Sequence, residues 1–264
     1  MGGTESNLAA IGHLMPLAFL TNNHASMLPI RLAPTRLDVW LSTALGSLLN
    51  RAPVFDLGVQ SAIRHQVLGG FWFAAVLYIY WVKAARDEDK ETQFRILTTL
   101  CGSVLAILLA LAAESVVSWP PPMRNPMLKS VFPPYFDISP SVNCFPSLST
   151  TLYGSVAAGI YPVSKRVGTL LWIAVVFAVA LPRMYVGGHY LSDVLVGAAL
   201  ALVGYSSARL LLCKWLRPRA ESLVAGKGLG RLAWEVLMFV WILQVAIEFR
   251  DAIWVKRAIQ FFLD

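Results

Sequence analysis

Long runs without a charged side chain limit what this chain can fold into more than any other feature of its sequence. Six such runs occupy residues 66–82, 96–113, 145–164, 167–182, 194–208 and 232–247, and only the last contains an acid, Glu235. A helix rises about 1.5 Å per residue, so each run approaches the roughly 17 to 25 residues that cross about 30 Å of hydrocarbon. With 57% hydrophobic and 14% charged residues, the sequence predicts an all-α, polytopic membrane protein with six spans.

The first 65 residues are expected to form an interfacial region and not a seventh span. The stretch "NLAAIGHLMPLAFL" is broken by Pro16, follows no basic residue and lacks the n-region of a secretory signal. Residues 37–50 have apolar side chains at helical spacing beside Asp38, so they are expected to lie among headgroups or to pack on the bundle. The predicted division is an interfacial region at 1–65, a six-helix membrane catalytic domain at 66–250 and an amphipathic tail at 251–264.

Lysine and arginine are unevenly divided between the loops, and this division predicts the orientation. The loops after the second and fourth spans hold only Arg124, Lys129 and Arg183. The loops after the first, third and fifth spans hold Lys83, Arg86, Lys90, Arg95, Lys165, Arg166, Arg209, Lys214, Arg217, Arg219, Lys227 and Arg231. Because cytoplasmic loops collect basic residues, the first group is expected to face outward. The same bias accounts for the net charge of +7, so no nucleic-acid partner is expected.

One outward segment, "RMYVGGHYLSD", combines groups that suit phosphate chemistry. His189 and Asp193 are four residues apart, so the carboxylate is expected to accept a hydrogen bond from the imidazole. That bond would leave the other ring nitrogen as a nucleophile and stabilise the imidazolium formed after attack. Arg183 precedes a glycine pair that permits a tight turn, and a guanidinium beside a helix N-terminus forms an anion site.

A second outward segment, "FPSLST", places Ser147 at the start of the third run, where it can cap the helix or bind an anion. Each segment alone also has a purely structural explanation, as flanking charges in one case and as an N-cap in the other. Together they favour a phosphate site. Cys144 lies beside the second segment, but the three cysteines lack metal-ligand spacing, and no metal is expected.

The two segments together resemble the type 2 phosphatidic acid phosphatase (PAP2) superfamily of membrane lipid phosphatases and phosphotransferases. The family motif S-R-x5-H-x3-D is similar to Arg183, His189 and Asp193, with Pro182 where serine usually stands. The motif P-S-G-H is similar to "PSLS" at 146–149. The resemblance extends over about residues 119–208.

This resemblance implies a role for each matching residue. His189 would attack phosphorus and form a phosphohistidine, with Asp193 orienting it, while Arg183 and Ser147 would hold the phosphoryl oxygens. It also implies a PAP2-type six-helix bundle with its site at the outward face, and no cofactor.

Two departures from the family pattern bear on catalysis. Ser149 stands where the family has the histidine that protonates the leaving oxygen, so the usual general acid is missing from this catalytic position. A phosphate leaving from a diphosphate needs a proton less than an alkoxide does, so this serine favours a diphosphate substrate or an impaired protein. The motif K-x6-R-P is absent as written; Arg124 and Lys129 are the candidates for its phosphate-binding charges, or are solvated loop charges.

The sequence therefore predicts an integral membrane lipid phosphatase of the plasma or inner membrane, whose partners are membrane lipids and a phosphorylated lipid substrate. The predicted substrate is a lipid phosphate or diphosphate, such as a polyprenyl diphosphate or a phosphatidate-like molecule. One alternative is a lipid phosphotransferase, because "FPSLS" is similar to the "FPSLH" of the inositol-phosphotransferase branch of the family. Another is a catalytically impaired lipid-phosphate binder or transporter.

Overall fold

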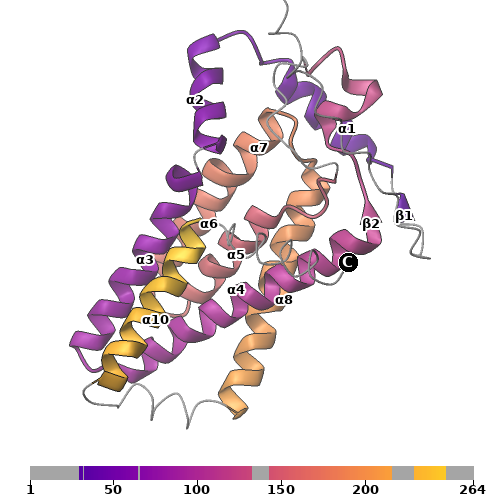
Figure 1. Ribbon diagram of the computed structural model, residues 1–264. Helices are drawn as coiled ribbons and strands as arrows, with labels where there is room; N and C mark the ends of the chain where they lie inside the picture. The colour runs from indigo at the N-terminus through magenta and orange to yellow at the C-terminus, as the bar shows by residue number, and fades with distance from the viewer. Residues whose placement is uncertain (1–29, 32, 65, 133–142, 216–228, 248–264) are drawn as a thin grey trace, which may run out of the picture.

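The computed structural model describes residues 30–31, 33–64, 66–132, 143–215 and 229–247, and most of these residues are helical (Figure 1). The helices are α1 (Arg36–Gly46), α2 (Pro53–Arg64), α3 (Gln66–Arg86), α4 (Lys90–Val116), α5 (Leu148–Ile160), α6 (Lys165–Ala174), α7 (Leu181–Tyr185), α8 (Leu191–Trp215) and α10 (Leu229–Ala246). Shorter elements are the 3-10 turns η1 (Pro122–Arg124) and η2 (Pro126–Leu128), the π-helical η4 (Val175–Ala180), and strands β1 (Ile30–Arg31) and β2 (Val117–Ser118). The strands form a two-residue parallel ladder, and the predicted helical class is confirmed.

Three helical segments in the described part of the chain are long and apolar enough to cross a membrane. They are Lys90–Val116, Lys165–Tyr185 and Leu191–Leu212, and a shorter apolar helix covers Leu232–Ala246. These segments support the predicted membrane protein, but the count of six spans is not confirmed. The run at 145–164 shows one reason, because its first residues are loop and α5 itself has only 13 residues.

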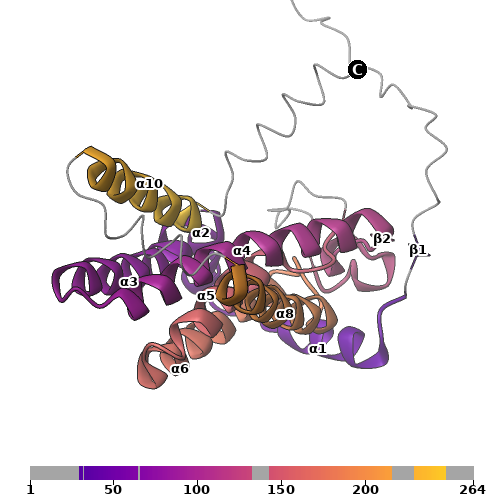
Figure 2. The same cartoon turned by 90° about the horizontal axis from the view of Figure 1, so that it is seen from below.

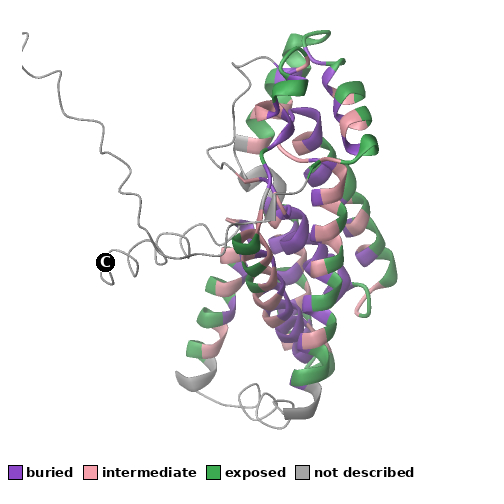
Figure 3. Ribbon diagram, turned by 90° about the vertical axis from the view of Figure 1, so that its right-hand side faces the viewer, coloured by how far each residue is buried: buried purple, intermediate pink, exposed green. Residues whose placement is uncertain are grey.

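Helix α5 lies inside the bundle, between α4, α6 and α8 (Figures 1 and 2). Every residue from Ser149 to Ile160 is buried. Buried residues of the neighbouring helices lie beside them in the interior of the bundle (Figure 3). Small residues allow this close packing: a side chain at Gly159 would collide with Thr99 on α4. A Cβ at Gly204 on α8 would lie 2.6 Å from the Ala106 backbone. Small residues at helix contacts are typical of membrane bundles.

Two hydrogen bonds between polar side chains join helices inside the bundle. Trp81 on α3 donates its indole N–H to a Glu235 carboxylate oxygen on α10 at 2.6 Å. Ser155 on α5 donates to the Ser103 hydroxyl on α4 at 2.9 Å. An unpaired carboxylate in hydrocarbon is costly, so the first pair accounts for the acid within the last apolar run.

Helices α1 and α2 pack at one end of the bundle, where α1 contacts α7 and α8, and α2 contacts α7 (Figure 1). Helix α1 begins with a capping box formed by Thr35 and Asp38. Residues 37–50 therefore pack on the bundle, which is one of the two arrangements expected for them. Residues 1–29 and the predicted tail at 251–264 lie outside the described residues, and the three-part division of the chain stays a prediction.

Candidate active site

The two polar loops meet at the end of the bundle where α7 ends and α8 begins. Met123 in η1 donates its N–H to the Gly187 carbonyl at 3.0 Å, and the Asn125 side-chain amide donates to the Tyr190 hydroxyl at 2.9 Å. His189 Nδ1 lies 2.9 Å from the Cys144 carbonyl oxygen. These three contacts join the segment before η2, the segment before α5 and the segment before α8. The structure thus brings the two polar loops together at one end of the bundle.

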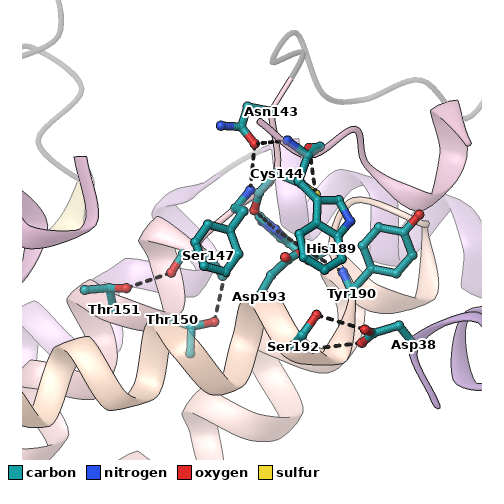
Figure 4. A network of polar contacts seen from close by, with 12 residues as sticks. Asp38, Asn143, Cys144, Ser147, Thr150, Thr151, His189, Tyr190, Ser192 and Asp193 are labelled. Atoms are coloured by element: carbon teal, nitrogen blue, oxygen red, sulfur yellow. Dashed lines mark hydrogen bonds and ion pairs between the residues drawn. The ribbon is translucent and has the colours of Figure 1, made fainter. Parts of the chain in front are cut away.

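His189 lies two residues before α8, with its side chain 16% exposed. A carbonyl oxygen can only accept a hydrogen bond, so Nδ1 carries the proton and donates a hydrogen bond to the Cys144 carbonyl oxygen (Figure 4). In the neutral imidazole this leaves the lone pair on Nε2. The expected hydrogen-bond acceptor was Asp193, and this part of the prediction is wrong: the nearest carboxylate oxygen is 3.7 Å from Nδ1, because the Cys144 carbonyl occupies that position.

Asp193 is fully buried in the first turn of α8. Its Oδ2 accepts the Tyr190 backbone N–H at 2.7 Å, which is the reciprocal half of a capping box. Its Oδ1 is buried and has no hydrogen-bond partner among the described residues. At 3.7 Å from the imidazole, this carboxylate can stabilise an imidazolium by its charge even without a direct hydrogen bond.

The N-terminus of α5 lies against the N-terminus of α8. Ser147 is fully buried at the N-cap of α5, and its N–H donates to the Asp193 carbonyl at 3.2 Å. Its hydroxyl pairs with the Thr150 hydroxyl at 2.9 Å and makes no capping bond to the backbone. Two helices of 13 and 25 residues therefore begin side by side, and the positive ends of their dipoles favour an anion between them.

Ser149 occupies the first turn of α5 and is 3% exposed. No hydrogen bond joins its hydroxyl to His189 within the described part of the chain. The structure thus places Ser149 two residues after Ser147, buried in the first turn of α5.

Arg183 lies in the last turn of α7, is partly buried, and accepts the Gly188 N–H through its carbonyl at 2.8 Å. Gly187 has a φ of 75°, which glycine adopts at little cost. The predicted tight turn is therefore present, and it returns the chain from the end of α7 to His189.

Arg124 and Lys129 differ in their placement. Arg124 is partly buried at the end of η1, directly between the two residues that bond to Gly187 and Tyr190. Lys129 is exposed at the end of η2. The bonds made by its two neighbours thus hold Arg124 near the site, whereas Lys129 lies on the surface.

Cys144, His189 and Asp193 each offer a ligand atom within 4.8 Å of the others, so their spacing alone would admit a metal ion. Their chemistry fits one poorly. Burial, and then the neighbouring Asp193 charge, raise the pKa of the Cys144 thiol above its usual range. A thiol that stays protonated is a poor metal ligand and a poor nucleophile. Burial also raises the pKa of Tyr190 to about 12, so this phenol is not a base near neutral pH.

Two groups of the site were missed by the sequence reasoning. One is the Cys144 carbonyl, a backbone atom that no motif reveals. The other is Asn143, whose Oδ1 accepts the N–H groups of Trp119 and Phe145 at 3.0 and 3.2 Å. Its amide donates to the Val117 carbonyl at 2.7 Å. This asparagine fastens the segment before α5 to the end of α4, and only its position beside Cys144 could have drawn notice.

Comparison with known proteins finds similarity over part of the chain that includes His189 and Asp193. Residues 129–219 match the family model described as the PAP2 superfamily. The chain is also 28% identical over 150 residues to Bacitracin transport permease protein BcrC of Bacillus licheniformis. That match covers 56% of this chain and 66% of the relative, slightly less than two thirds of its length. No solved structure shows a significant match.

Proposed function

We propose that this chain is an integral membrane lipid phosphatase that works through a phosphohistidine, because residues 129–219 match the model of the PAP2 superfamily, whose members include phosphatases. The observation that carries the proposal is the hydrogen bond from His189 Nδ1 to the Cys144 carbonyl. It leaves the Nε2 lone pair available beside two helix N-termini, where an anionic headgroup is favoured.

The first step is attack of His189 Nε2 on phosphorus. The nitrogen lone pair forms the N–P bond while the bond from phosphorus to the leaving oxygen breaks, and that oxygen takes the electron pair. The imidazolium so formed keeps its Nδ1–H bond to Cys144 and lies 3.7 Å from the Asp193 carboxylate. Ser147 and Arg183 hold the phosphoryl oxygens as charge builds on them, with Arg124 as a further cation and Lys129 as a guide for approaching headgroups.

The second step is hydrolysis of the phosphohistidine. Water attacks phosphorus, the N–P bond breaks, and its electron pair returns to Nε2 while inorganic phosphate leaves with both protons of the water. A histidine at position 149 would assist both steps by moving protons, and the serine in its place cannot do so near neutral pH.

Ser149 makes a lipid diphosphate the favoured substrate. In a phosphate monoester the leaving group is an alkoxide, which needs a proton as the bond breaks. In a diphosphate the leaving group is the remaining phosphate, which is stable without one. We therefore propose a polyprenyl diphosphate as the substrate class, ahead of a phosphatidate-like monoester.

The proposed arrangement in the membrane is a six-helix domain at 66–250, with the site at the outward face of the plasma or inner membrane. The basic loops at the other end support this orientation. Glycine and serine positions inside α5 allow it to serve as a short third span packed closely against α4 and α8.

A non-hydrolytic lipid-phosphate binder or transporter is the second candidate, and Ser149 is the observation that favours it. The name of the Bacillus relative, a transport permease, also supports a transport role. Against it stands the pairing of His189 with the Cys144 carbonyl and the Asp193 charge, which phosphate binding alone does not require.

The test is phosphate release by the purified protein in detergent, on one polyprenyl diphosphate and one phosphatidate. We expect release from the diphosphate and little or none from the phosphatidate. A binder or transporter would release none from either lipid. A strict phosphotransferase would release little inorganic phosphate, and an added acceptor alcohol would become phosphorylated instead.

Charge reversal at Arg183 is expected to weaken headgroup binding. The Arg183→Glu variant should bind a non-hydrolysable lipid diphosphate analogue about tenfold or more weakly, because it replaces a charge-assisted contact by repulsion. The measurement is equilibrium binding in detergent. The matched control is Arg166→Glu, which reverses an exposed charge at the opposite end of the same helical run. Equal affinities in the two variants would remove Arg183 from the site.

A further inference from the structure

Asp38 on α1 contacts the candidate site from outside the residues matched by the family model. It is 2% exposed. One oxygen, Oδ1, accepts the Ser192 backbone N–H at 3.0 Å, while Oδ2 accepts the Ser192 hydroxyl at 3.1 Å. The same Oδ2 accepts the N–H and hydroxyl of Thr35 at 3.0 and 2.7 Å. A single carboxylate thus joins the start of α1 to the start of α8 (Figure 4).

The contact with Ser192 falls at a position that matters for catalysis. Ser192 lies in the first turn of α8, between the proposed nucleophile and Asp193, and its N–H has no acceptor within its own helix. Asp38 supplies that acceptor, and its negative charge suits the positive end of the helix dipole. Asp193 accepts the neighbouring Tyr190 N–H. Two buried carboxylates therefore fix the backbone that carries His189.

The other flank of the same segment is also held by the N-terminal helices. Tyr185, at the end of α7, donates its hydroxyl to Asp56 on α2. Asp56 is 2% exposed and also accepts the Asn50 N–H at 2.8 Å. Helices α1 and α2 thus hold the chain just after Arg183 and again at Ser192, on either side of the glycine turn.

From these contacts we infer that Asp38 is a positioning residue for the phosphoryl transfer: it sets the direction of the His189 imidazole through Ser192. This inference rests on the proposed function. It assigns the N-terminal helices a role in turnover, which hydropathy and the family motifs do not give them. Asp38 itself does not touch the substrate.

The test compares Asp38→Asn with Asp89→Asn in the full-length protein. Asp89 also caps the start of a helix: it is the exposed N-cap of α4, where it accepts the N–H and hydroxyl of Thr92, away from the site. Four quantities are measured for each variant: hydrogen exchange of the peptide covering 186–198, kcat and KM on the polyprenyl diphosphate, and the melting temperature. The unsubstituted protein and His189→Ala are run in parallel.

A positioning role predicts a particular combination of results. In Asp38→Asn, exchange at residues 190–193 should accelerate about tenfold or more. The kcat should fall about 10- to 100-fold with KM within about twofold, because a misplaced nucleophile lowers the rate more than the binding. Asp89→Asn should change neither the exchange at residues 190–193 nor kcat, even if it lowers the melting temperature as much as Asp38→Asn does. Ser192→Ala removes the hydroxyl that donates to Asp38. It should therefore lower kcat more in the otherwise unsubstituted protein than in the Asp38→Asn variant.

Unchanged exchange at 190–193 in Asp38→Asn would overturn the inference whatever the turnover. Faster exchange with unchanged kcat would overturn the positioning role and leave the proposed function standing. No turnover in the unsubstituted protein, or turnover retained in His189→Ala, would instead overturn the proposed function and the positioning role that rests on it.

Discussion

Replacing His189 by alanine is expected to reduce phosphate release to the background rate, a loss on the order of 10⁴-fold or more, because the variant has no atom that can form the N–P bond. Binding of a non-hydrolysable lipid diphosphate should change little, since Ser147, Arg183 and the two helix N-termini are untouched. The measurement is turnover together with equilibrium binding in the same detergent.

The structure also sets the controls for this variant. His189 is partly buried against the Cys144 carbonyl, so loss of turnover counts only if the melting temperature and elution volume are retained. His65→Ala is a matched histidine substitution, at a position that the sequence places just before the first predicted span. Full turnover in His189→Ala would refute the nucleophile and direct attention to another group at this end of the bundle.

Replacing Ser149 by histidine is expected to have the second largest effect, a gain of about 10² to 10⁴ in cleavage of the phosphatidate. The new imidazole would stand in the first turn of α5, beside the buried Ser147, where a proton could be delivered to a leaving alkoxide. Diphosphate cleavage should rise much less, because its leaving group needs no proton. The measurement is phosphate release from both lipids by both proteins.

Three outcomes of this comparison separate the candidate functions. Cleavage of the diphosphate alone by the unsubstituted protein, with monoester cleavage gained in the variant, supports the leaving-group argument. Cleavage of both lipids only in the variant would identify a disabled lipid phosphatase. No cleavage of either lipid by either protein would favour a transferase or a binder. Position 149 is buried, so Ser149→Ala and the melting temperatures show whether a histidine there disturbs the packing of α5.

Three charged or titratable residues of the candidate site lie close together in the sequence, which is why the sequence could predict that they are near one another. Arg183, His189 and Asp193 lie within eleven residues, and the glycine turn between them is present with Gly187 at positive φ. The helical class follows from hydropathy in the same way, because an apolar run reports its environment without reference to any distant residue. The number of spans does not follow so directly, since α5 is a short helix surrounded by other helices and its hydropathy resembles that of a span.

The sequence by itself predicted a helical membrane protein that resembles the PAP2 superfamily, with a histidine, an arginine and a serine expected to act on a phosphorylated lipid. Tertiary structure decided how those groups are held. Asp193 was expected to orient His189, but the Cys144 carbonyl holds that position, 45 residues earlier in the chain. Asp38, which the sequence placed in a helix lying among headgroups or packed on the bundle, caps α8 at a separation of 154 residues. The physical reason is that backbone acceptors carry no sequence signal, and a buried carboxylate is paired with whichever donors the packed helices bring to it.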